Sequence, residues 1–330
     1  MSAAASGAKR VAVVGVGYWG KNIARSFSEL GALGAIVDSD AATAASVSEV
    51  TGAPVRTLDD VLADPEISGI AIATRAETHF ALATQALSAG KHVFVEKPLV
   101  LDQGEADLLI AQAADAGRTL MVGHLLRYHP LFRKMLEIVQ SGEHGVLRYV
   151  YSDRMSLGKI RTEEDVLWSF APHDVSMVLA LAGEEPVGVS AQGQDFVNTG
   201  IADYATAQLR FASGLKADIR TSWMSYKKVQ ICVAICDQAT IVFEDSEPDW
   251  GKKLAVHPHE VVMENGYPVP KRGAMHYVDV AKGEPLKEEC THFLGCLDGA
   301  APLTNGTEGR AVLRVLRRAS EAMQASGRAN

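Results

Sequence analysis

The sequence predicts two domains: an α/β domain with a doubly wound parallel sheet, followed by an α+β domain with a large, mainly antiparallel open sheet. Two observations support this division. Up to residue 125, short apolar runs alternate with helical stretches, whereas after about residue 145 apolar and polar residues alternate with period two. We therefore expect domains at residues 1–125 and 126–330, with closing helices able to pack back on the first domain.

The first domain contains five short runs that are apolar on nearly every residue. This pattern is typical of parallel strands whose two faces are both covered. Between two runs lies a helical pattern at 78–90, THFALATQALSAG, and Gly90 is placed to end that helix. The five runs are Val11–Gly15, Ala35–Val37, Gly69–Ala73, His92–Val95 and Leu120–Gly123.

The period-two segments of the second domain predict strands with one apolar face. In residues 202–211, ADYATAQLRF, every second residue is apolar, and Ser213-Gly214 then turns the chain. Residues 215–220 resume the alternation, which predicts an antiparallel hairpin. The pattern returns in Val229–Ile235, and two helices at roughly 285–299 and 307–325 close the chain.

The other face of this sheet carries amphipathic residues such as Tyr204, Thr206 and Trp223. Such a face either meets solvent or packs on a second subunit. We favour the subunit, and therefore expect a homo-oligomer, a dimer or a tetramer, formed through the C-terminal sheet.

Composition excludes several classes of protein. A net charge of −8 argues against a nucleic-acid binder, which needs a basic face. The first apolar run, Val11–Val14, is too short for a signal peptide or a membrane span, so we expect no membrane partner. The four cysteines form no CxxC motif and have no histidine at zinc-finger spacing. We expect a reduced, cytoplasmic protein without a metal site.

A glycine-rich turn follows the first predicted strand. Residues 11–20 read VAVVGVGYWG, so Gly15, Gly17 and Gly20 match the dinucleotide-binding pattern G-x-G-x-x-G of a Rossmann domain. This motif is weak alone, but here it lies between a strand and a helix. Asp38 ends the next strand, where a carboxylate can bind the adenosine ribose and repel a 2′-phosphate, which favours NAD over NADP. Alternatively, Asp38 is a turn residue that caps a helix.

A second charged motif ends the strand in KHVFVEKPLVL, residues 91–101. Lys97 lies at the carboxyl end of this strand, the edge at which open α/β sheets bind ligands. Pro98 restricts the backbone of Lys97, since a residue before proline is held out of the helical region. A lysine acts as a base when its pKa falls toward neutrality from about 10.4.

These motifs carry a family resemblance. The segments GVGYWG, AIATRAETH, EKP and VGHLLRYHP, with CTHFLGCLDG and TEGRAVLRVL near the end, resemble the glucose-fructose oxidoreductase / inositol dehydrogenase / MocA (Gfo/Idh/MocA) family over nearly the whole chain. The resemblance implies that Lys97 is catalytic, binds substrate and cofactor, and precedes a cis bond to Pro98. Further cofactor contacts are implied at Tyr18, Trp19, Thr74, His79, Glu96 and His124. Alternatively, His79 N-caps and packs the helix that follows it.

A second family signature is a helical histidine with an aspartate four residues before it. Here the region reads LWSFAPHDVSMVL, so His173 matches the histidine, but Ser169 stands where the aspartate is usual. The resemblance therefore implies that Lys97 and His173 carry the proton transfer, with His173 also touching substrate. Partial replacement of the missing carboxylate by Asp165 or Asp174 stays open.

The substrate is indicated by a cluster of cations. Arg154, Lys159 and Arg161 precede His173, and a diphosphate is one reason for such cations. The alternative is a charged loop, since acidic residues follow at 163–165. By the family pattern, Arg127 and Tyr128 also border the substrate, although both can be structural.

The segments RMSLGKIR and LWSFAPHDVS are most similar to the nucleotide-sugar branch of this family. That branch implies NAD-dependent oxidation of the C3 hydroxyl of UDP-N-acetylglucosamine, feeding a PLP aminotransferase on a route to the diamino sugars of lipid A. The alternatives are the corresponding uronic acid as substrate, a simple sugar or inositol, and a regulatory protein that keeps the fold without catalysis.

Overall fold

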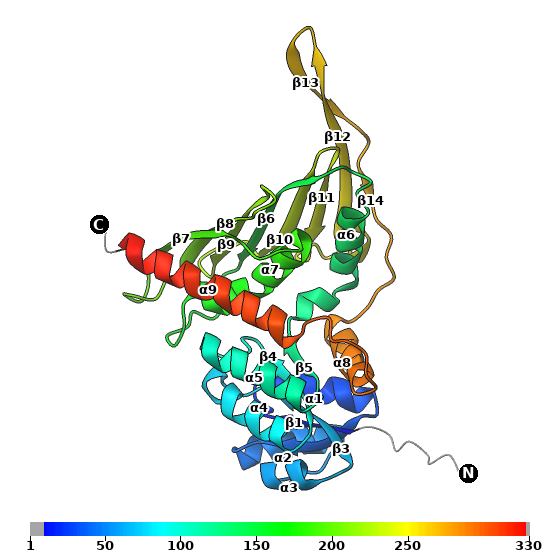
Figure 1. Cartoon of the computed structure of the whole chain (residues 1–330), viewed down its shortest axis with the longest axis vertical. Coiled ribbons are helices and arrows are strands. Elements are labelled where there is room, and N and C mark those ends of the chain that lie inside the picture. Colours follow the sequence, from blue (N-terminus) through cyan, green and yellow to red (C-terminus); the bar gives the residue numbers. More distant parts are fainter. Residues whose placement is uncertain (1–9, 328–330) are drawn as a thin grey trace, which may run out of the picture. The chain divides into compact units, whose positions relative to one another are not determined.

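The computed structural model describes residues 10–327, which form two compact units (Figure 1). Unit 1 contains the chain through Tyr128 together with Glu284–Leu313, and unit 2 contains His129–Gly283 and the chain from Arg314 onward. Helix α9 (Gly306–Gly327) begins in unit 1 and ends in unit 2. Helix α8 (Pro285–Cys296), although late in the sequence, belongs to unit 1.

The sheet of unit 1 is entirely parallel, with the strand order β2-β1-β3-β4-β5. This confirms the doubly wound sheet and all five strands. Val55 adds a parallel bridge to Ile36 at the outer edge. The order reverses between β1 and β3, so a ligand is expected at the carboxyl ends of those strands. The bounds are β1 (Arg10–Val14), β2 (Leu33–Val37), β3 (Ile67–Ile72), β4 (His92–Glu96) and β5 (Leu120–Gly123).

The crossover helices of unit 1 begin at side-chain caps in three cases. Asp40 accepts the first amide N–H groups of α2, Thr57 forms a capping box for α3, and Asp102 caps α5. Helix α1 begins without a side-chain cap. The elements are α1 (Gly20–Glu29), α2 (Ala41–Thr51), α3 (Leu58–Ala63), the 3-10 turn η1 (Ala76–Thr78), α4 (His79–Ser88), α5 (Gln103–Asp115) and the 3-10 turn η2 (Leu125–Tyr128).

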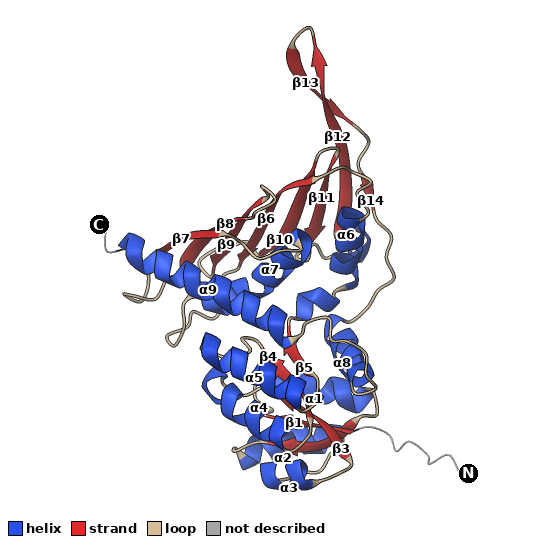
Figure 2. Ribbon diagram, viewed as in Figure 1, coloured by secondary structure: helices blue, strands red, loops and turns tan. Residues whose placement is uncertain are grey.

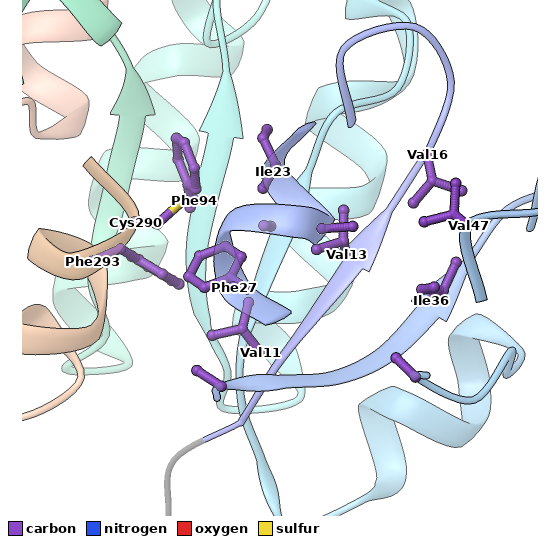
Figure 3. Packing of buried hydrophobic residues seen from close by; sticks show 14 of the residues in the cluster. Val11, Val13, Val16, Ile23, Phe27, Ile36, Val47, Phe94, Cys290 and Phe293 are labelled. Atoms are coloured by element: carbon purple, nitrogen blue, oxygen red, sulfur yellow. The ribbon is translucent and has the colours of Figure 1, made fainter. Parts of the chain in front are cut away.

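The core of unit 1 lies between its sheet and helices α1 and α8 (Figure 3). Phe293 of α8 packs on Phe94 of β4 and Phe27 of α1, with ring centroids 5.7 and 6.2 Å apart. Cys290 joins the same cluster. Each fully buried phenylalanine contributes about 1.5–3 kcal/mol, so these contacts hold α8 firmly against strand β4 and helix α1.

Unit 2 is built on a nine-stranded sheet whose main path is β13-β12-β11-β10-β6-β9-β8-β7, with β14 paired to β12. Only the β6–β9 pair is parallel among the described pairings of this sheet. The mainly antiparallel sheet and the β8–β9 hairpin are confirmed, and Gly214 turns the hairpin with φ +90°. The strands are β6 (Leu147–Met155), β7 (Gly188–Gln194), β8 (Tyr204–Arg210), β9 (Lys216–Ser222), β10 (Val229–Cys236), β11 (Ala239–Glu244), β12 (Leu254–Glu264), β13 (Tyr267–Arg272) and β14 (His276–Tyr277).

Helices cover one face of this sheet (Figure 2). They are α6 (Pro130–Gln140), α7 (Val166–Ala182) and the later part of α9, while the 3-10 turn η3 (Trp250–Lys252) precedes β12. Among the described residues, no helix is both long and apolar enough to cross a membrane. The four cysteines, Cys232, Cys236, Cys290 and Cys296, are buried and free.

The structure corrects one expectation about the uncovered face. Trp223 does not lie there: it is fully buried, its indole N–H donates to the Asp203 carboxylate, and its ring meets Phe170 of α7 edge-on. Tyr204 and Thr206 remain on the face opposite the helices, because the inward positions of β8 are its alternate alanine and leucine residues.

Candidate active site

The three glycines of the turn between β1 and α1 differ in the room that the structure leaves for a side chain. Gly15 adopts φ +84°, and a Cβ there would lie 2.6 Å from Thr74 Cγ2. A Cβ on Gly20 would lie 1.9 Å from the Gly15 carbonyl oxygen, so no other residue fits. Gly17 faces open space, with nothing within 4 Å of an added Cβ. Helix α1 begins without a side-chain cap, and the Lys21 and Asn22 N–H groups of its first turn donate to the Gly17 and Trp19 carbonyl oxygens at 3.3 and 2.8 Å. No side chain therefore occupies the positive end of the helix, where a pyrophosphate is expected.

Asp38 ties the end of β2 to this turn. One carboxylate oxygen accepts the Val16 amide N–H at 2.7 Å, and the other accepts the Asp40 N–H at 2.9 Å. Each carboxylate oxygen has a second acceptor site, so Asp38 can still bind ribose hydroxyls. Asp40, rather than Asp38, caps helix α2. Asp38 thus makes the turn contact of the alternative reading, while the helix cap belongs to its neighbour, and ribose binding by Asp38 stays a prediction.

The EKP motif is bonded to the glycine-rich turn through Glu96. Its Oε1 accepts the Trp19 indole N–H at 2.5 Å, and its Oε2 accepts the Lys97 amide N–H at 3.1 Å. Gly123, opposite Glu96 in β5, leaves the necessary room, since a Cβ there would lie 3.0 Å from the carboxylate. Tyr18, by contrast, is 89% exposed, with the Lys21 ammonium 5.7 Å from its ring centre.

Lys97 is half-buried just beyond β4, and the Lys97-Pro98 bond is cis, as predicted. The loop after it is held by His79, whose Nδ1 lies 2.8 Å from the Pro98 carbonyl oxygen and whose Nε2 lies 3.2 Å from that of Thr74. Burial lowers the pKa of His79. The His79 ring therefore joins two loops of the site, and its contact with the cofactor stays a prediction. The Thr74 hydroxyl bonds that of Thr78 at 2.7 Å.

His124 follows β5 and is only 1% exposed, yet neither ring nitrogen has a hydrogen-bond partner among the described residues. Burial, together with the positive charges of Arg127 and Lys97, lowers the pKa of His124 to about 3. The imidazole is therefore neutral at physiological pH. A buried ring with unmet hydrogen-bonding capacity fits a position beside a ligand.

Two predicted substrate residues have structural partners instead. Arg127 is buried in an ion pair with Glu308 of α9. Tyr128 is 2% exposed, and its hydroxyl shares a 2.9 Å hydrogen bond with Thr304 while burial raises its pKa. Both side chains thus fasten η2 to the segment before and within α9. These partners favour the structural alternative for Arg127 and Tyr128, and their contact with substrate stays a prediction.

In unit 2, helix α7 presents Ser169 and His173 one turn apart, on the same side of the helix. Asp165 caps the helix by accepting the Trp168 N–H at 3.0 Å, and burial raises the pKa of Asp165. Gly183, with φ +68°, ends the helix. Ser169 is buried, whereas His173 is half-buried.

Asp174 is fully buried and committed to Arg154. The Arg154 guanidinium donates to it at 2.6 Å from Nε, and the Ser152 hydroxyl donates at 2.5 Å. This pair joins β6 to α7 on the covered face of the sheet. This ion pair argues against a diphosphate contact of Arg154, which stays a prediction, and it commits Asp174 to Arg154 rather than to the place of the missing catalytic carboxylate.

The other two predicted cations lie in the loop between β6 and α7. Lys159 is exposed, and Arg161 forms a 2.8 Å ion pair with Glu164. Arg161 thus pairs with one of the acidic residues that follow it, as the charged-loop alternative predicts, while Lys159 faces solvent. Within residues 10–327, no group of three or more His, Cys, Asp or Glu side chains is placed to hold a metal ion.

Sequence reasoning missed one buried acid of the unit 1 site, Glu289 of α8. It is 0% exposed, and neither carboxyl oxygen has a hydrogen-bond partner in the described structure. A signal was present in the sequence, since Glu289 stands four residues before the core residue Phe293 and thus on the apolar side of its helix.

A glycine-rich turn at the switch point of a parallel sheet, a helix without a side-chain cap, a carboxylate at the end of β2 and a lysine just beyond β4 are typical of an NAD-dependent oxidoreductase. Comparisons with known proteins agree. Residues 9–124 match the "Oxidoreductase family, NAD-binding Rossmann fold", and residues 132–242 match the GFO/IDH/MocA C-terminal domain. The chain belongs to the Gfo/Idh/MocA family, whose relatives here are dehydrogenases of CH–OH groups.

Individual relatives are similar over most of the chain. UDP-N-acetylglucosamine 3-dehydrogenase of Acidithiobacillus ferrooxidans is 31% identical over 92% of this chain and 94% of its own. A solved structure of that enzyme has a TM-score of 0.83, with 28% identity over 96% of this chain and 98% of that one. Inositol 2-dehydrogenase of Rhizobium meliloti is 29% identical over 64% of this chain and 68% of its own.

Proposed function

We propose that the protein oxidises the C3 hydroxyl of UDP-N-acetylglucosamine to a 3-keto sugar with NAD as oxidant. The observation that carries this proposal is the similarity to UDP-N-acetylglucosamine 3-dehydrogenase, which extends over 92% of the chain and includes the second domain. The two proposed acid/base residues also support it, since Lys97 follows strand β4 and His173 lies on helix α7.

Oxidation of an alcohol removes a hydride from carbon and a proton from the hydroxyl oxygen. Bound NAD supplies the hydride acceptor. Lys97 and His173 are proposed to take up the hydroxyl proton, and Ser169 in place of an aspartate leaves these two groups with that task. The cofactor would be held by Gly15, Gly17, Trp19, Gly20 and Asp38, with Thr74, Glu96 and His124 completing the nicotinamide side and exposed Tyr18 at its edge.

The diphosphate of the substrate is proposed to meet Lys159 and Arg161. Lys159 is exposed on the loop before α7, and the ion pair of Arg161 with Glu164 is partly exposed, so either cation can turn toward a phosphate. Arg154 is left out of this role because Asp174 neutralises it.

A 3-keto sugar is a substrate for amine transfer, so the product is proposed to pass to a PLP aminotransferase on a route to diamino sugars of the lipid A type. We further propose that the protein works in the cytoplasm, since its four cysteines are buried thiols. A homo-oligomer, dimer or tetramer, is proposed to cover the outer face of the unit 2 sheet. The half-buried Tyr149 and Tyr151 of β6, with ring centres 6.3 Å apart, support such an interface.

A second candidate substrate is a simple cyclitol or sugar. The similarity to inositol 2-dehydrogenase favours it, although that match covers a smaller part of the chain. The corresponding UDP uronic acid differs from the first candidate only at C6.

The test is a coupled reaction. Purified protein is incubated with NAD, glutamate, a PLP aminotransferase and one of three substrates: UDP-N-acetylglucosamine, its uronic acid or myo-inositol. The product is then identified by mass. An amino sugar formed from UDP-N-acetylglucosamine supports the proposal. An amino sugar formed only from the uronic acid, or NADH formed only with inositol, contradicts it.

A further inference from the structure

Glu289 is an unusual residue for its surroundings. It lies on α8 next to Cys290 and one helical turn before Phe293, both in the apolar core of unit 1. It is completely buried, and neither carboxyl oxygen has a hydrogen-bond partner among the described residues. An ionised carboxylate without a partner is costly in such a place, so Glu289 is expected to hold a proton.

The second carboxyl of this region is Glu96. Phe94 and Glu96 are two residues apart in β4 and so point to the same face of the sheet. Phe94 packs on Phe293 (Figure 3). Phe293 shares a side of α8 with Glu289, since the two residues are four apart. Helix α8 therefore directs Glu289 toward the face of β4 that carries Glu96. Burial raises the pKa of Glu289 well above its usual range, and the nearby charge of Glu96 raises it further.

The two carboxyls have different surroundings, which decides where the single proton stays. Burial raises the pKa of Glu96 as well, but the N–H groups that it accepts from Trp19 and Lys97, and the positive charge of Lys97, favour its ionised form. Glu289 has no such donor. When two acids share a buried site, the one without donors keeps the proton. The region then carries one negative charge, on Glu96.

We propose that Glu289 is a positioning residue for the cofactor site. Two ionised carboxylates cannot bond to each other, but a neutral Glu289 carries an O–H that can donate to ionised Glu96 and so fix Trp19 and the Lys97 backbone. The proposal rests on NAD binding by this chain and does not depend on which sugar is oxidised.

The first test observes the proton directly, without substrate. Infrared spectra at neutral pH are compared for the wild type, Glu289→Gln and a matched control, Glu288→Gln, which alters the exposed neighbouring residue of the same helix. We expect a carbonyl stretch of a neutral carboxylic acid in the wild type and in the control, lost in Glu289→Gln. Its absence from the wild type, or its persistence in Glu289→Gln, would overturn the proposal.

The second test measures binding of NAD and NADH by quenching of tryptophan fluorescence. Glu289→Leu removes the donor, and loss of a hydrogen bond to a charged group is expected to weaken NAD binding about tenfold or more. Glu289→Gln keeps an N–H donor and is expected to bind NAD within about threefold of the wild type. Equal weakening by both variants, or by neither, contradicts the proposal. If Glu289→Leu does not fold, the infrared comparison still decides. Both tests can succeed even if UDP-N-acetylglucosamine proves to be the wrong substrate.

Discussion

The cofactor side of unit 1 and the β6–α7 loop of unit 2 are organised in contrasting ways. Around the glycine-rich turn, polar side chains are bonded to neighbouring segments: half-buried Asp38 to Val16, half-buried Glu96 to Trp19, and buried His79 to two loops. The predicted substrate cations divide between a neutralised, buried Arg154 and the exposed or partly exposed Lys159 and Arg161. The cofactor side is thus preorganised for one ligand, the dinucleotide. In the β6–α7 loop, by contrast, the choice of substrate depends on a few solvent-facing charges.

The largest effect on activity is expected when the proposed proton acceptor of either region, Lys97 in unit 1 or His173 in unit 2, is replaced. Lys97→Ala and His173→Asn are each expected to lower kcat by roughly 10²–10⁴-fold, because general-base assistance is worth that much. Steady-state kinetics measures the loss, and NAD titration with thermal melting shows whether the cofactor site and fold survive. Turnover near the wild-type level in both variants would contradict these assignments.

The buried pair of unit 2 gives the largest expected effect on stability. Asp174→Ala leaves Arg154 buried and unpaired, so we expect a loss of about 3–5 kcal/mol in the free energy of unfolding, measured by urea denaturation. Glu137→Gln is the matched control, because its ion pair with Lys134 is exposed and worth well under about 1 kcal/mol. A stable Asp174→Ala variant with a raised KM for the sugar would instead make Arg154 a substrate ligand.

Substitutions at two glycines of the cofactor turn are expected to affect different properties, stability for Gly20 and NAD affinity for Gly17. Gly20→Ala places a Cβ 1.9 Å from the Gly15 carbonyl and is expected to destabilise unit 1 by roughly 1–3 kcal/mol. Gly17→Ala meets nothing within 4 Å, so its melting temperature should match the wild type while its affinity for NAD falls, since Gly17 is where backbone approaches the pyrophosphate. Calorimetry and NAD titration distinguish the two, and equal NAD affinity in Gly17→Ala and wild type would argue against this placement.

The smallest expected effect concerns the exposed loop. Lys159→Ala is expected to raise the KM for a UDP-sugar by a few-fold, with a difference that shrinks in high salt, because exposed charges contribute only about 0.2–1 kcal/mol and are screened. Lys282→Ala, another exposed lysine of unit 2, serves as control. An identical KM in wild type and Lys159→Ala would remove this lysine from the substrate site.

Much of the cofactor region was predictable because its signals are local. The spacing of Gly15, Gly17 and Gly20, the apolar runs of the parallel strands and the EKP motif each lie within a few consecutive residues. The cis bond at Lys97-Pro98 followed from the family resemblance and is present. By contrast, Arg127, Tyr128 and Arg154 have the residue types of ligands, and nothing near them in the sequence reveals the partners that occupy them.

The sequence by itself determined the parallel and mainly antiparallel sheets and the NAD fingerprint, and it supplied the candidate pair Lys97 and His173. Only the tertiary structure decided which polar residues are committed elsewhere: Arg127 to Glu308, Tyr128 to Thr304 and Arg154 to Asp174. It also brought Glu289, from the far end of the chain, to the core behind the EKP motif. The physical reason is sequence separation, since periodicity records which face a residue occupies but not which distant side chain meets it there.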